Sequence, residues 1–416
     1  MIIKILTKLF GPAMGFRFYR IYWAGALISL TGFRVLTFSQ FWVIHELTQS
    51  ALYLGYVAIA SVMPSVVLNL YGGILADRFN RKILICCTHS LNALLILILG
   101  ILIFTNTIHP WHVLVIAFLT GSVSSIEQPS FASIYPTLVK KHVLTNAVSL
   151  FVMIGPISYI TGPAIAGLII SLTNTALAFV FSSLSLIIMA IFVLLLPTVP
   201  ENSVKNSTKN DFIQGINYLL TNKRICFLIL LSFALAFFGL SYIPMMPIFT
   251  VDILNLGADA QGIMMGIGGI GAVFASLIIS RLNNLRITSN LILLGAFLFG
   301  ILITIFGFTS SEFANYFLAV TLMFFIGFFA STFWVSITTS LQLVISESMR
   351  GRVMGMFGLT WNFPAAGGLY VAFIAGFLGH GNTSVPIVIA SGGILIMLLA
   401  LGYFFWNKQS HKIHHL

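Results

Sequence analysis

Long apolar runs are the feature that most constrains this chain. Charged residues and turn residues separate twelve such runs, at 19–45, 51–76, 83–108, 112–138, 143–172, 175–196, 225–249, 261–280, 289–309, 315–345, 353–379 and 385–406. Each is close to the roughly 20 residues that an α-helix needs to cross a bilayer. Because the runs are uniformly apolar instead of alternating, they predict membrane helices and not the strands of a barrel.

The scarcity of charge excludes the water-soluble classes of protein. Only 7% of the 416 residues are charged, whereas a soluble domain carries about 25%. A chain with so few charges cannot cover a water-facing surface of its own size. A soluble enzyme, a nucleic-acid-binding domain and a disordered protein are therefore excluded, and no nucleic-acid partner is expected.

The distribution of Lys and Arg predicts the orientation in the membrane. If the N-terminus is cytoplasmic, 19 of the 20 cations fall in segments on the cytoplasmic side, and the remaining one, Arg34, lies inside the first run. The positive-inside rule then places both termini in the cytoplasm. The first run lacks the features of a cleavable signal peptide. The net charge of +11 therefore reports topology and does not indicate an acidic partner.

A polar stretch divides the chain into two similar parts. We expect an N-terminal bundle of six helices at 1–196, a linker with a membrane-surface helix at 197–224, a second bundle at 225–407 and a cytoplasmic tail at 408–416. Run two begins near Leu54-Gly55 and run eight near Gln261-Gly262, a weak internal echo that favours duplication. Internally repeated membrane proteins of this kind are often secondary transporters whose site lies between the repeats.

The turn after the second run carries a family signature. It reads Gly72-Gly73-Ile74-Leu75-Ala76-Asp77-Arg78-Phe79-Asn80-Arg81-Lys82. The segment resembles the inner-loop signature of the major facilitator superfamily, with Asn80 at the place of a Gly. Asn tolerates a left-handed turn, so we expect the loop shape to survive. The resemblance implies a gating latch of Gly73, Asp77, Arg78 and Arg81 that closes the inner face, with Asp77 facing the start of span eleven. The alternative is a loop that serves topology alone.

A closer resemblance covers most of the chain. Its motifs are Pro129 to Pro136, Leu144-Thr145-Asn146-Ala147, Gly162-Pro163-Ala164-Ile165-Ala166-Gly167 and Arg350 to Gly355. They resemble the branch that holds macrolide-efflux and enterobactin-exporter proteins, which implies export of small organic molecules, usually driven by proton entry. Two departures weaken the expectation of proton coupling. Phe33 follows Gly32 where many relatives have Asp, and span four lacks the Arg of many drug antiporters.

Two charged residues fall inside the predicted hydrocarbon region, Arg34 in span one and Glu127 in span four. A charge at the bilayer centre costs about 2.5–3.5 kcal/mol on insertion scales, so both must face protein or water. Three interpretations stay open. The two form a structural ion pair; or Arg34 holds an anionic group of the cargo while Glu127 carries the coupling proton; or one of them reaches an interface by snorkelling.

Weaker candidates lie in both halves. Trp334, Trp361 and Asn362 could bind bulky cargo, although aromatic residues in helices more often serve packing. Helix bending is expected at Gly162, Pro163, Gly167 and Pro364. His89 in span three is either a satisfied buried polar residue or a member of a proton relay.

The functional expectation follows from these features together. The sequence shows no nucleophile constellation, phosphate loop or metal-ligand spacing, so we expect no enzyme, no cofactor and no bound metal. We expect a monomeric twelve-helix transporter of the major facilitator fold, working by alternating access in the bilayer. It would export a drug-like molecule or a carboxylate-bearing siderophore in exchange for protons. The alternatives are an uptake carrier for the same compounds, a lipid flippase, or a membrane scaffold or receptor that moves nothing.

Overall fold

The structure is a computed structural model that describes residues 7, 10–78, 80–197, 217–281, 285–312, 315–379 and 381–413. The backbone of these residues is helical between short turns, and they contain no strand. Most of the predicted linker, including the start of its surface helix, lies outside the described residues. So does the end of the tail.

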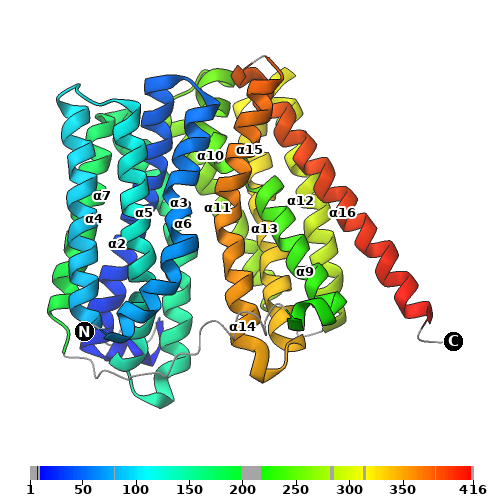
Figure 1. The fold of residues 1–416 in the computed structure, drawn as a ribbon, viewed down its shortest axis with the longest axis horizontal. Helices are drawn as coiled ribbons and strands as arrows, with labels where there is room; N and C mark the ends of the chain where they lie inside the picture. Colours follow the sequence, from blue (N-terminus) through cyan, green and yellow to red (C-terminus); the bar gives the residue numbers. More distant parts are fainter. Residues whose placement is uncertain are drawn as a thin grey trace. The chain divides into compact units, whose positions relative to one another are not determined.

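The helices follow the predicted runs closely. In the first half they are α2 (Arg17–Thr48), α3 (Ala51–Arg78), α4 (Arg81–Phe104), α5 (Pro110–Ile134), α6 (Leu144–Leu172) and α7 (Thr175–Leu194). In the second half they are α9 (Lys223–Ala234), α10 (Tyr242–Pro247), α11 (Ala258–Ile279), α12 (Leu285–Glu312), α13 (Tyr316–Val344), α14 (Glu347–Gly358), α15 (Phe363–Phe377) and α16 (Val385–Ile413), as Figure 1 shows. Among the described residues, nine helical segments are long and apolar enough to span a membrane. The all-helical membrane fold is confirmed, while the number of twelve spans stays a prediction.

The chain forms two compact units. Unit 1 comprises Met1–Thr48, Ile59–Val204 and Gly257–Gly266, and unit 2 comprises Gln49–Ala58, Lys205–Leu256 and Ile267–Leu416. The beginning of α3 thus belongs to unit 2 and its remainder to unit 1. The beginning of α11 belongs to unit 1 and its remainder to unit 2. The predicted domain boundaries did not include this reciprocal exchange.

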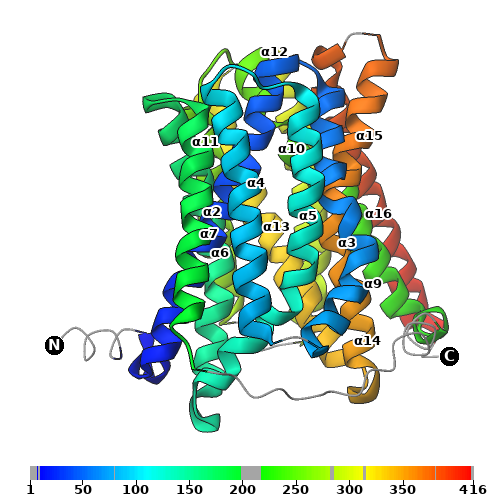
Figure 2. The ribbon, with the colours of Figure 1, turned by 60° about the vertical axis from the view of Figure 1, so that its left-hand side comes forward.

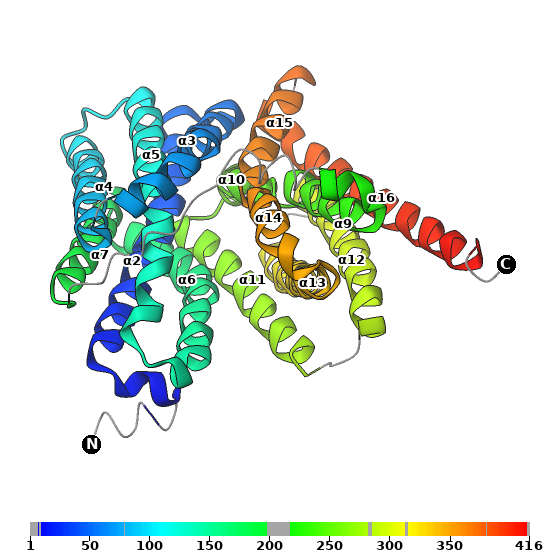
Figure 3. The same cartoon turned by 60° about the horizontal axis from the view of Figure 1, so that its bottom comes forward.

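The same helix pairings recur in both units. In unit 1, α4 packs along α5 and α7, and α2 packs along α6 and α7 (Figures 2 and 3). In unit 2, α12 packs along α13 and α16. There the π-helical turn η4 (Leu235–Gly239), which follows α9, contacts α15 and α16. Equivalent pairings in equivalent order support the duplication that the internal echo of runs two and eight predicts.

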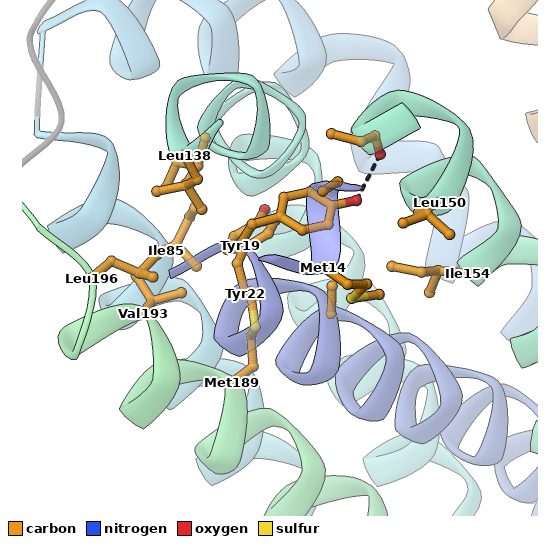
Figure 4. Close-up of a cluster of buried hydrophobic side chains, with 14 of the residues drawn as sticks. Met14, Tyr19, Tyr22, Ile85, Leu138, Leu150, Ile154, Met189, Val193 and Leu196 are labelled. Atoms are coloured by element: carbon orange, nitrogen blue, oxygen red, sulfur yellow. Dashed lines mark hydrogen bonds between the residues drawn. The ribbon is translucent and has the colours of Figure 1, made fainter. Parts of the chain in front are cut away.

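A buried cluster at one end of unit 1 fixes the beginning of α2. It joins Met14, Tyr19 and Tyr22 to side chains of α4, α6 and α7 (Figure 4). The Tyr19 hydroxyl donates to the carbonyl of Ala147 at 2.7 Å, drawn as the dashed line. The Tyr22 hydroxyl donates to the carbonyl of Phe131. Because a tyrosine away from water needs a hydrogen-bond partner, these bonds fix how α2 packs against α5 and α6.

Proline positions divide some spans and leave others continuous. The path from α14 to α15 passes through a 3₁₀ turn, η6 (Leu359–Asn362), and Pro364 is the second residue of α15. A proline in the first helical turn needs no backbone N–H, so it marks this new start. Pro163, by contrast, lies inside α6, which continues through it as one helix.

Candidate functional site

Arg34 lies near the middle of α2 against an aromatic ring of α6. Its Cζ is 3.8 Å from the centroid of the Tyr159 ring, within the range of a cation–π interaction. Gly162, one helical turn further along α6, supplies the space for this approach. A Cβ on Gly162 would overlap the Cβ of Arg34 and lie 3.3 Å from its Cα. The missing side chain of Gly162 therefore leaves the space that Arg34 occupies between α2 and α6.

The contact with Tyr159 leaves the hydrogen-bonding capacity of Arg34 unused. A ring face accepts no bidentate hydrogen bond, and a guanidinium has five N–H donors. Within the described part of the chain, Arg34 forms no hydrogen bond or ion pair with another residue. The site thus presents a cation whose planar donors are available to a carboxylate.

Glu127 contacts His89, not Arg34. The Oε2 atom of Glu127 lies 3.1 Å from Nδ1 of His89, and the two side chains are 15% and 2% exposed. The reason lies in the packing, because α5 runs along α4 and touches α2 only sparsely. The interpretation of Arg34 and Glu127 as an ion pair therefore does not describe this structure.

A second acceptor determines which ring nitrogen of His89 carries hydrogen. Nδ1 of His89 also lies 3.2 Å from the carbonyl oxygen of Ile85. A carbonyl only accepts, so Nδ1 is the ring nitrogen that carries hydrogen and Nε2 is the one left to gain a proton. The His89 ring stacks on Phe131, with centroids 6.0 Å apart and planes at 20°. The described residues contain no group of three or more metal-ligating side chains, so the pair is not part of a metal centre there.

A simple register count would have found this pair. The loop that joins α4 to α5 is short, so the two helices form an antiparallel hairpin. His89 lies fifteen residues before the end of α4 at Phe104, and Glu127 lies seventeen residues after the start of α5 at Pro110. At 1.5 Å per residue the two depths, about 22 and 25 Å, are close. Depth alone does not distinguish His89 from Arg34 as the partner of Glu127, and no sequence motif marks Tyr159 or Tyr22.

An aromatic cluster in unit 2 contains two of the predicted residues. The rings of Trp334 on α13 and Trp361 on η6 stack with centroids 4.9 Å apart. Phe357 on α14 lies 6.0 Å from Trp334. The indole Nε1 of Trp334 is buried without a hydrogen-bond partner among the described residues, whereas Trp361 is 55% exposed. Asn362 follows Trp361 as the last residue of η6. The cluster offers an apolar face together with one unused donor.

The predicted latch is described only in part. Gly73, Asp77 and Arg78 lie in α3, but their side chains are outside the described part, so the latch stays a prediction. Arg81 is the first residue of α4, and Asn80 is its N-cap. Asn80 does not use the left-handed conformation that Asn tolerates, because its φ is −59° and its side chain accepts from the backbone N–H of Lys82 at 3.0 Å. Asn80 therefore serves as a helix cap.

Gly167, predicted as a bending residue, brings two helices of unit 1 together. A Cβ on Gly167 would lie 3.1 Å from the Cα of Gly262 on α11, and a Cβ on Gly262 would lie 2.6 Å from the carbonyl oxygen of Pro163. Small residues allow backbones in a membrane to approach this closely. The glycines of the 162–167 motif thus pack α6 against α2 on one side and α11 on the other.

Known proteins resemble this chain over nearly its whole length. The staphyloferrin A transporter of Staphylococcus aureus (strain NCTC 8325 / PS 47) is 26% identical over 375 residues, which is 88% of this chain and 91% of that protein. Macrolide efflux protein A of Streptococcus pyogenes is 25% identical over 348 residues, 82% of this chain and 85% of that protein.

Solved structures show the same fold. The nucleoside transporter NupG superposes with a TM-score of 0.72 at 17% identity, covering 93% of this chain and 99% of that one. A bacterial homologue of the iron transporter ferroportin, in an inward-facing state, gives 0.69 at 16% identity, covering 93% and 98%.

The family itself is established by a match that spans the chain. The family described as transmembrane secretion effectors matches residues 10–412. With the membrane helices and these relatives, the match confirms the predicted resemblance to the macrolide-efflux and siderophore branch. The chain is a multi-pass bacterial inner-membrane protein and belongs to the transmembrane secretion effector family of major facilitator transporters, which act on small molecules.

Proposed function

We propose that this protein exports a small organic anion, such as a carboxylate-bearing siderophore, across the inner membrane in exchange for protons. The observation that carries the proposal is Arg34, a cation in the middle of α2 that stacks on Tyr159 and keeps its donors available. A charge held at this depth is costly unless it serves a ligand or a partner. Relatives named for staphyloferrin A transport and macrolide efflux support cargo of this size class.

The aromatic cluster of unit 2 supplies a second kind of contact. Trp361 presents an exposed indole face supported by Trp334, suited to the apolar part of a drug-like or siderophore cargo. Asn362 follows Trp361 and adds a polar side chain. We therefore propose Arg34 as the residue that binds the anionic group, and Trp334, Trp361 and Asn362 as further substrate-binding residues of unit 2.

The remaining parts of the proposal concern the cycle. Glu127 carries the coupling proton, and the two bundles rock between inward-open and outward-open states as in other secondary transporters. Gly73, Asp77, Arg78 and Arg81 form the inner latch. The protein works as a monomer with both termini in the cytoplasm, as the one-sided Lys and Arg distribution supports.

Transport into inverted membrane vesicles tests direction and cargo together. Staphyloferrin A and a macrolide are offered separately, with and without an imposed proton gradient. We expect gradient-dependent accumulation of the carboxylate-bearing cargo. Arg34→Gln should weaken its apparent affinity about tenfold or more, because a hydrogen-bonded charge contributes about 1.5–3 kcal/mol.

Two comparisons make the result decisive. Arg17→Gln removes an exposed cation from the first residue of the same helix and should change nothing. Accumulation only in right-side-out vesicles would indicate uptake and overturn the proposed export. Equal transport by wild type and Arg34→Gln would refute the assignment of the anionic group.

A further inference from the structure

The proton site in unit 1 contains a second titratable group beside Glu127. Nδ1 of His89 lies 3.1 Å from the carboxylate, and the imidazole is 2% exposed. We propose that His89 and Glu127 act as one proton-binding pair that carries the coupling proton, an inference that rests on the proposed function. His89 is then a member of the site that binds the transported proton.

The hydrogen bonds of His89 decide where an added proton resides. Nδ1 faces two oxygens, that of Glu127 at 3.1 Å and that of Ile85 at 3.2 Å, so Nδ1 holds its hydrogen throughout. A proton entering from water on one side adds to Nε2 of His89 or to the carboxylate of Glu127, and it later leaves to water on the other side. No other bond forms or breaks. Because the two groups are in contact, removing either one changes the surroundings of the other.

Other ionisable groups on the helices around the pair have contacts of their own. On α2, the Tyr22 hydroxyl donates to the Phe131 carbonyl, and Arg34, twelve residues further along, stacks on Tyr159 of α6. On α4, Lys82 donates to the carbonyl of Leu196 at 2.6 Å, and Cys86 lies one turn before His89. Tyr135 follows α5, α7 has no ionisable residue, and the side chains of 69–79 on α3 lie outside the described part. Among these described neighbours there is no second carboxylate and no second imidazole.

The surroundings distinguish the pair from a solvated surface contact. Phe131 covers one face of the imidazole and Tyr22 holds the backbone of that phenylalanine in place. Glu127 retains 15% exposure while His89 retains 2%. The carboxylate is thus the more exposed member of the pair, and the histidine is the member held inside the protein. A proton that reaches Glu127 can be shared with His89 while the imidazole stays buried.

Two substitutions separate a protonation role from a structural role. His89→Asn keeps an N–H donor near the position of Nδ1, so it preserves the bonds to Glu127 and Ile85 but cannot titrate. Glu127→Gln keeps the shape and removes the charge. His142→Asn removes an exposed histidine of the same unit and serves as the matched control.

The first experiment measures the pH profile of proton-driven staphyloferrin A transport, with gradient-free exchange of the same cargo measured in parallel. We expect His89→Asn and Glu127→Gln to lose gradient-driven accumulation at every pH while exchange persists. His142→Asn should match wild type. A wild-type profile in His89→Asn would overturn the inference, because a structural role survives that substitution.

The second experiment needs no cargo. Potentiometric titration of the purified protein counts the protons bound between about pH 5 and 8, around the ordinary range of histidine. We expect each single variant to lose a proton-binding step, and the double variant to lose less than the sum of the single losses. Independent, additive losses would overturn the shared site. Failure of wild type to transport either cargo would refute the proposed function, while the titration would still decide the pair.

Discussion

Gly162→Ala tests whether the approach of α2 to α6 positions Arg34. The new methyl group would overlap the Cβ of Arg34 and lie 3.3 Å from both its Cα and its Cγ, whereas packed carbons sit about 3.5–4.0 Å apart. The first atom of the arginine side chain cannot rotate away, so the helices must separate. Overpacking of this kind costs about 1–3 kcal/mol. The helix-propensity gain of about 1 kcal/mol is opposed by crowding between the new methyl group and the following Pro163. We expect Gly162→Ala to be less stable than Gly155→Ala by about 1–3 kcal/mol.

Gly155→Ala provides the matched control in the same helix. Apart from its chain neighbours, no atom lies within 4 Å of a Cβ at that position. Gly155 precedes Pro156 as Gly162 precedes Pro163, so both variants share the crowding of a side chain before proline, and only Gly162→Ala adds the contact with Arg34. Thermal unfolding of the purified proteins in one detergent compares the two variants, and staphyloferrin A binding reports the position of Arg34. Equal stability of the two variants together with unchanged binding would refute the close-approach reasoning.

Three further substitutions test separate contacts. Tyr159→Leu removes the ring over which Arg34 lies at 3.8 Å and should cost about 0.5–2 kcal/mol of thermal stability, whereas Tyr159→Phe should be nearly neutral because it keeps the ring; equal losses would contradict the cation–π contact. Asn80→Ala removes the cap on the Lys82 N–H and should lower the free energy of unfolding, measured with denaturant, by about 1 kcal/mol, whereas Asn80→Gly should lower it by only a few tenths. Trp361→Ala should weaken binding of a macrolide by more than Trp361→Phe does, because the exposed ring face is what the cargo would contact. Radioligand binding measures this difference.

The membrane fold was predictable because a bilayer leaves a chain few choices. Backbone groups inside lipid must be paired within the segment, so a long apolar run becomes a helix with little influence from its neighbours. Helices such as α2 and α13 therefore begin and end within a few residues of the predicted runs. The family was equally accessible, since its loop motif and the 162–167 motif are local patterns.

Partner choice within the bundle could not be predicted in the same way. Whether Glu127 contacts Arg34 or His89 depends on which helices neighbour α5. Apolar composition does not encode this, although the short loop between α4 and α5 indicates His89. The role of Asn80 was open for a similar reason, because a residue at a turn can serve either by adopting a left-handed conformation or by capping, and only the backbone angle decides. Gly162 and Gly167 were expected to bend α6, but the structure uses their missing side chains for close approach.

From the sequence, Arg34 and Glu127 could form a single pair of charges, whereas the structure gives each of them a partner of its own. Arg34 interacts with α6 through Tyr159, and Glu127 interacts with α4 through His89. The two sites nevertheless share α2, which carries Arg34 and also Tyr22, whose hydroxyl holds the Phe131 carbonyl beside His89. A continuous helix that moves when cargo engages Arg34 must also move Tyr22 relative to α5. Binding of cargo at Arg34 can therefore change the environment of Glu127 without direct contact between the cargo and Glu127.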